Sequence, residues 1–134
     1  MRDWASLEDP AINVFDQRGN VSLLHDLLQS GERVLAVATA GDPHARLRSG
    51  FLAVTNQRVV FVCERFLRRP SVVSLAFESV RSVKLTAEPI SGTLDIDAGD
   101  DSIRFGFIRP KERTWPLYWR LSERIGQLPL REHS

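Results

Sequence analysis

The sequence predicts a mainly β protein, a seven-stranded antiparallel roll or barrel capped by a C-terminal helix, with an extra short helix before the first strand. Three observations support this prediction. Apolar runs rich in Val, Leu, Ile and Phe recur at a spacing of about ten residues between 33 and 108. Two of these runs are apolar on both faces, and helical periodicity appears only on either side of the region.

Composition favours one domain. The chain has 134 residues, of which 43% are hydrophobic, enough for a core without disulfides or metal. A net charge of +1 does not favour a nucleic-acid-binding protein, which is usually more basic. Cys63 is the one cysteine, so no intrachain disulfide can form. No stretch resembles a signal peptide or a membrane span. We therefore expect a cytoplasmic location, with the protein either free or attached to the membrane periphery.

We divide the chain into an N-terminal arm (1–19), a single domain (20–128) and a C-terminal tail (129–134). The arm mixes acids and scattered apolar residues without a clear period. Either its apolar residues lie along the barrel, or Trp4 reaches a neighbouring chain.

The first helix is predicted to begin at Asn20, a good N-cap, and to end before Gly31, placed as a C′ glycine would be. Between them, one face carries leucines at helical spacing, which we expect to pack on the core: Leu23, Leu24, Leu27 and Leu28.

The central feature is a hairpin over Gly50–Arg65, with a polar break at Asn56 and Gln57. Because strand side chains alternate between faces, runs that are apolar on both faces belong inside a barrel or sandwich. The remaining strands are predicted at Arg33–Ala40, Ser71–Phe77, Val80–Thr86, Thr93–Ile96 and Ser102–Ile108.

The last helix is predicted to start near Thr114, as its cap, with Pro116 in the first turn and Gly126 and Pro129 at its end. One face carries most of its large side chains and is expected to close the barrel: Trp115, Tyr118, Leu121, Ser122 and Ile125.

Over residues 26–126 the chain resembles the bacterial pleckstrin-homology-like (PH-like) domains of the YokE type. The most specific match is Thr55-Asn56-Gln57-Arg58, which resembles the Thr-Asn-x-Arg hairpin of that family. The resemblance also rests on Leu28, Gly31, Glu32, Val34, Gly50, Leu52, Val54, Val59, Val60, Phe61, Phe77, Val80, Val83, Gly92, Leu94, Ile96, Ile103 and Phe105. It implies a binding or assembly module at membranes or between proteins, and no reaction. Arg46-Leu47-Arg48 matches part of the phosphoinositide motif of eukaryotic PH domains, but the first strand lacks its lysine.

No catalytic or metal site is predicted, and no cofactor. The three histidines, at positions 25, 44 and 133, could act as bases, but no nucleophile can be paired with any of them from the sequence. Cys63 is interpreted as a small buried hydrophobe. The acidic run Asp95–Asp101 fails the spacing of a calcium loop and is interpreted as a hairpin tip, with Asp95 and Asp97 outward.

The one charged feature above background is an arginine cluster on the two loops that flank the central hairpin: Arg46, Arg48, Arg65, Arg68 and Arg69. In a PH-like roll these loops open at the same end. The leading hypothesis is a non-catalytic module for protein–protein interaction or homo-oligomerisation, through strand edges and charged loops. The alternative is a peripheral domain whose arginine cluster binds anionic lipid headgroups. Solvated arginines that bind nothing remain a third interpretation.

Overall fold

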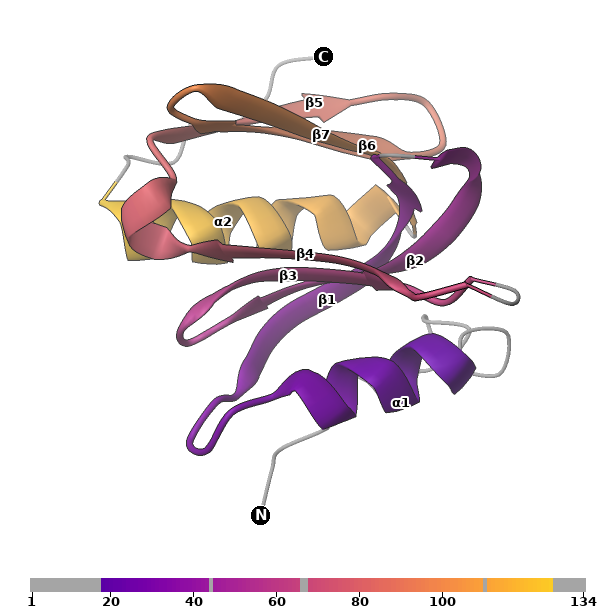
Figure 1. Cartoon of the computed structure of the whole chain (residues 1–134). Helices are drawn as coiled ribbons and strands as arrows, with labels where there is room; N and C mark the ends of the chain where they lie inside the picture. The colour runs from indigo at the N-terminus through magenta and orange to yellow at the C-terminus, as the bar shows by residue number, and fades with distance from the viewer. Residues whose placement is uncertain (1–17, 44, 66–67, 110, 127–134) are drawn as a thin grey trace.

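The computed structural model describes residues 18–43, 45–65, 68–109 and 111–126, with seven strands and two α-helices among them (Figure 1). The predicted arm through residue 17, His44, Phe66, Leu67 and the tail lie outside the described residues. In chain order the elements are α1 (Arg18–Leu27), β1 (Val34–Asp42), β2 (Ala45–Thr55), β3 (Arg58–Cys63), β4 (Ser71–Ala76), η2 (Phe77–Ser79), β5 (Ser82–Ala87), β6 (Gly92–Ala98), β7 (Asp101–Ile108), η3 (Lys111–Arg113) and α2 (Thr114–Ile125).

The strands form two antiparallel sheets, β1-β2-β3-β4 and β5-β6-β7. They meet at one corner, where Thr39 of β1 and Arg109 after β7 exchange backbone hydrogen bonds. At the other corner, β4 and β5 are not paired, and α2 lies between the sheets (Figure 1). The mainly β fold and the capping C-terminal helix are therefore confirmed, although the roll is two sheets rather than one closed sheet.

The main core lies between the two sheets and α2. Its largest members come from all three layers: Phe61, Phe105, Leu52, Leu94, Ile96, Ile108, Leu117 and Leu121. The rings of Phe61 and Phe105, one from each sheet, lie 5.4 Å apart between centroids. On β6, Leu94 and Ile96 point inward while Asp95 is half-buried and Asp97 exposed, as predicted.

A second, smaller core lies on the outer face of the first sheet. There Leu24 and Leu28 pack with Val37, Phe51 and Val60. In Figure 1, α1 and α2 cover opposite faces of this sheet. This arrangement explains why the central hairpin is apolar on both faces, and it confirms that the leucine face of the first helix packs on the core.

Both predicted ends of the first helix were wrong. Asn20 lies inside α1, and its Oδ1 accepts a hydrogen bond from the Glu64 N–H at 2.6 Å, so a tertiary contact uses the side chain that was assigned to capping. The helix ends at Leu27, and Gly31, with φ 78°, lies in the next turn, where the Glu32 N–H donates to the Gln29 carbonyl oxygen.

The start of α2 also differs from the prediction. Thr114 is the first residue of the helix, and Arg113 before it makes no side-chain cap. Thr114 packs directly on Gly92, where an added Cβ would overlap the Thr114 hydroxyl oxygen. The predicted end is confirmed: Gly126, with φ 77°, follows the last turn and donates to carbonyl oxygens of that turn. Among the described residues, no helix is both long and apolar enough to cross a membrane.

Candidate functional site

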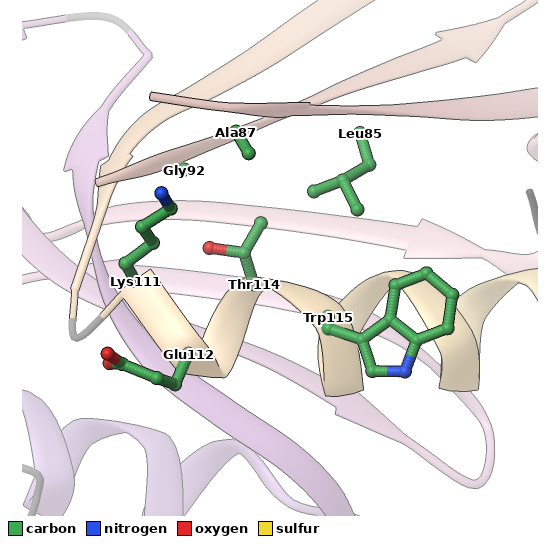
Figure 2. A pocket seen from close by; sticks show the side chains of 7 residues that line it. All are labelled: Leu85, Ala87, Gly92, Lys111, Glu112, Thr114 and Trp115. Atoms are coloured by element: carbon green, nitrogen blue, oxygen red, sulfur yellow. The ribbon is translucent and has the colours of Figure 1, made fainter. Parts of the chain in front are cut away.

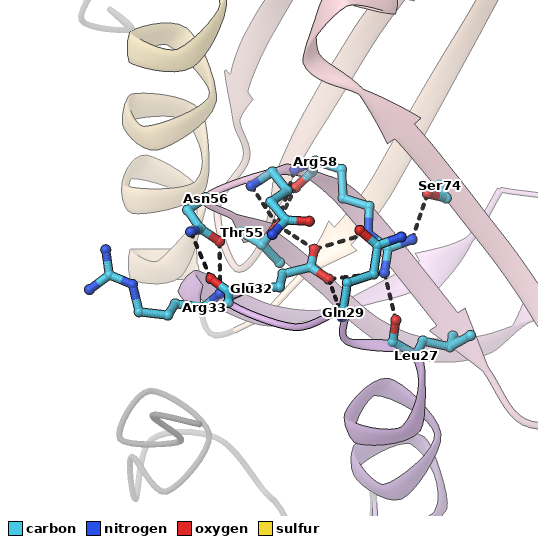
Figure 3. Close-up of polar contacts among 10 residues, drawn as sticks. Leu27, Gln29, Glu32, Arg33, Thr55, Asn56, Arg58 and Ser74 are labelled. Carbon is cyan, nitrogen blue, oxygen red and sulfur yellow. Dashed lines mark hydrogen bonds and ion pairs between the residues drawn. The ribbon is translucent and has the colours of Figure 1, made fainter. Parts of the chain in front are cut away.

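A buried ion pair connects the end of α1 with the central hairpin (Figure 3). The carboxylate of Glu32, whose side chain is fully buried, accepts hydrogen bonds from Arg58 Nε at 2.9 Å and from Arg58 Nη2 at 3.1 Å. Its two oxygens also accept from the Thr55 hydroxyl at 2.7 Å and the Gln29 N–H at 2.9 Å. We call Glu32, Thr55, Asn56 and Arg58 the hairpin network.

The other members of the hairpin network shape the turn. The Oδ1 of Asn56 accepts a hydrogen bond from the Arg33 N–H at 2.7 Å, and its Nδ2 donates one to the Gly31 carbonyl oxygen at 3.1 Å. The Thr55 hydroxyl accepts the N–H groups of Gln57 and Arg58, both at 3.0 Å. Neither turn residue has a positive φ, so side-chain hydrogen bonds take the place of a primed turn.

These contacts fix the charge of Glu32. Burial acts to raise the pKa of Glu32, but the hydrogen bonds from Arg58, Gln29 and Thr55 outweigh it and hold that pKa below its ordinary value. Arg58 is only 16% exposed, and it also donates to the Leu27 carbonyl oxygen at 2.7 Å. The Thr-Asn-x-Arg motif is thus a structural clamp, with its arginine committed inside the protein.

The arginine cluster falls on β2 and on the connection between β3 and β4 rather than on two loops, with Arg65, Arg68 and Arg69 outside the strands as predicted. Arg46 and Arg48 lie within β2, because its pairing with β1 continues to Ala45. Phe51 pairs with Val62, and Arg48 lies three residues before the one and Arg65 three residues after the other, at the same end of the sheet. Cys63 pairs with Ser71, and Arg65 and Arg69 each lie two residues beyond that pair at this end. These three arginines therefore reach one end of the first sheet, and Arg68 is adjacent in the chain.

Cys63 lies at this same end of the sheet. Burial raises the pKa of the Cys63 thiol, and Asp42 raises it further, while Arg48 and Arg65 act in the opposite direction. The thiol is 3.5 Å from the Ser49 carbonyl oxygen, which it can reach as a donor. The thiol is therefore protonated and buried near neutral pH, which agrees with its interpretation as a small hydrophobe.

The acidic hairpin shows no metal-binding arrangement. Asp95 pairs with Arg104 across the two strands, with 2.7 Å between Oδ1 and Nε. Asp97 accepts the Gly99 N–H at 3.0 Å, and Gly99 has φ 83°. In the part of the chain that the structure describes, no three His, Cys, Asp or Glu side chains lie close enough together to hold a metal ion.

The edge of β4 is the other feature a partner could use. β4 pairs with β3 on one side, and no described strand pairs with its other side. Its sequence, Ser-Val-Val-Ser-Leu-Ala, contains no charged residue, and Val72 is 44% exposed. At the other free edge, β5 carries the exposed Lys84. The prediction from the sequence concerned strand edges in general, although the lack of charge in β4 is visible in the sequence.

Two antiparallel sheets packed around a C-terminal helix define a PH-like domain. A family model described as "Bacterial PH domain" matches residues 28–118, and the chain belongs to this family. The YokE-type subgroup stays a prediction. The match includes the hairpin network and all seven strands but not α1. No curated protein matches the chain.

Membership gives the general class of function. Domains of this kind commonly bind proteins or lipids and are generally not catalysts. The family therefore supports the broad expectation of a binding module, and the particular partner has to be argued from the surface of this chain.

Proposed function

We propose that this protein is a non-catalytic assembly module that forms homo-oligomers through the edge of β4. The observation that carries the proposal is the uncharged, open edge over Ser71–Ala76. A free strand edge presents unpaired N–H and C=O groups, which a strand from another chain can satisfy.

The contrast between the two free edges supports this choice. Protective charges are the usual defence of an edge strand. β5 has an exposed lysine near its middle, whereas β4 exposes Val72, Ser74 and Ala76. Two copies of β4 can pair antiparallel about a two-fold axis, because such an interface uses the same surface on both partners.

A charged β4 edge tests the proposal. The double variant Val72→Lys with Ala76→Lys is expected to remain monomeric at concentrations where the unmodified protein forms a larger species in light scattering, because like charges would face each other across the pair. Ser82→Lys on β5 adds the same kind of charge to the other edge and should leave the oligomer intact. An unmodified protein that stays monomeric throughout, or an oligomer unaffected by the β4 lysines, would rule out this interface.

A second candidate function is the binding of anionic lipid headgroups by the arginine cluster. One observation favours it: the Nε of Arg65 is buried and makes no hydrogen bond with any described residue, although Arg48 and Arg69 approach the same end of the sheet. Guanidinium groups suit phosphate, and each is worth up to about 1 kcal/mol at an anionic membrane.

Vesicle sedimentation tests this second candidate. If the arginine cluster binds lipid, the protein should sediment with phosphatidylglycerol vesicles in a salt-sensitive manner, and Arg68→Glu with Arg69→Glu should abolish sedimentation. The control, Arg120→Glu with Arg124→Glu, makes the same charge change on the exposed side of α2 and should have little effect. Equal loss in both variants would indicate a response to net charge alone.

A further inference from the structure

A pocket of about 550 Å³ lies where the start of α2 faces the second sheet. Its walls come from β5, the start of β6, η3 and the first turn of α2 (Figure 2). The lining residues are Leu85, Ala87, Gly92, Lys111, Glu112, Thr114 and Trp115. The volume is within the range of small-molecule sites, about 300 to 1,000 Å³.

Polar groups gather at one side of the pocket. In Figure 2, the Lys111 ammonium and the Thr114 hydroxyl point toward the same space beside Gly92. Thr114 is 3% exposed, and its hydroxyl oxygen makes no hydrogen bond with a described residue. A buried hydroxyl without a partner costs stability, and such groups are rare unless a ligand or water satisfies them.

The helix adds to the positive character of this side. α2 has twelve residues, its N-terminus faces the pocket, and it has neither a side-chain cap nor an acidic residue in its first turn. The dipole of the helix therefore favours a negative group nearby, although Pro116 in the first turn contributes no N–H group. Glu112 also lines the pocket, but its carboxylate points away from Lys111 (Figure 2).

The remaining walls are apolar. Leu85 and Ala87 of β5 lie on the sheet side, and the ring of Trp115 lies farther along α2 (Figure 2). The ring of Trp115 also packs against the tilted rings of Tyr118 and Trp119, with centroids 5.5 Å and 5.9 Å away. A ligand with an acidic head at Lys111 would therefore place an apolar body against Leu85 and Trp115.

We propose that this pocket binds a small amphiphilic carboxylate, with its carboxylate at Lys111, Thr114 and the α2 N-terminus and its apolar part against Leu85, Ala87 and Trp115. The nearby charge of Glu112 favours a monoanion over a phosphate dianion. The proposal is independent of the β4 edge and of the arginine cluster, since it uses none of their residues.

Octanoate and octanol are suitable probes, because they share an apolar chain and differ in charge. In NMR titrations of the full chain, octanoate is expected to shift the backbone amides of Gly92, Thr114 and Trp115, together with the Trp115 indole. Octanol should bind more weakly, and inorganic phosphate should cause no comparable shift. Absence of these shifts with octanoate, or equal binding of octanoate and octanol, would overturn the proposal.

Three variants test which residues bind the carboxylate of octanoate. Lys111→Met and Thr114→Val should each weaken octanoate about tenfold, because each removes a charge-assisted hydrogen bond. Lys84→Met is the matched control, since Lys84 is the other lysine of the chain and lies on β5 outside the pocket. Undiminished octanoate binding in both pocket variants would also contradict the proposal.

Thr114→Val separates a ligand contact from a structural role. Because the hydroxyl lacks a partner in the free protein, its replacement by a methyl group of similar size should leave the melting temperature unchanged or raise it. Weaker octanoate binding in a variant of undiminished stability is the expected signature. A large fall in melting temperature would show that the hydroxyl serves the fold, and would remove Thr114 from the site.

Discussion

Replacing Glu32 by Gln is expected to destabilise the protein by about 3 kcal/mol, because the change leaves the largely buried Arg58 guanidinium without its counter-charge. Each carboxylate oxygen accepts two hydrogen bonds, one from Arg58 and one from either Thr55 or Gln29. Whichever way the new amide turns, its NH₂ group faces two donors. Urea unfolding, followed by tryptophan fluorescence, measures the loss, and Glu78→Gln, an exposed change of the same kind, should be nearly neutral.

The same variant should change how stability depends on pH. Since the pKa of Glu32 is lowered in the folded protein, its contribution is fully present above the unfolded value near 4.5 and is lost as the pH falls through the folded pKa. The difference in stability between the unmodified protein and Glu32→Gln should therefore be constant near neutral pH and shrink in acid. A gap that stays the same down to strongly acidic pH would contradict this account of the ion pair.

Patterns with a short period could be predicted from the sequence. The alternation of Leu94, Asp95, Ile96 and Asp97 placed β6 correctly, since the period of two decides which side chains enter the core. The runs around Phe51 and Val60, which are apolar on both faces, correctly predicted strands that are buried on both faces. The runs alone could not show which element packs on each face, because α1 and α2 come from opposite ends of the chain.

Contacts between distant residues could not be predicted in this way. Glu32 and Arg58 are 26 residues apart, and nothing near either of them in the sequence marks the pair. Consequently the sequence marked Arg58 only through its resemblance to the Thr-Asn-x-Arg hairpin, and its ion pair with Glu32 was not predicted. Asn20 and Thr114 have the residue types of helix caps, but packing against Glu64 and Gly92 decided their positions instead. Local propensity is weaker than such tertiary contacts.

The central hairpin itself contains a position that allows no side chain. Gly50 pairs with Ala40 on β1, and a Cβ added at Gly50 would overlap the Val62 carbonyl oxygen of β3 and lie 2.9 Å from its carbonyl carbon. All the atoms in the way belong to the backbone of a strand that is hydrogen-bonded on both sides. Gly50→Ala should therefore force β2 and β3 apart and cost about 3 kcal/mol or more.

Gly106→Ala provides the matched control for Gly50→Ala. Gly106 is also a strand glycine, but an added Cβ there meets nothing within 4 Å, and its φ is not positive. Alanine should consequently be tolerated or even stabilise the protein by about 0.4 to 1 kcal/mol, since it restricts the unfolded chain. Urea unfolding of both variants distinguishes a steric requirement from a general preference for glycine in strands. Similar losses in the two variants would show that the contact between Gly50 and Val62 is not what the fold depends on.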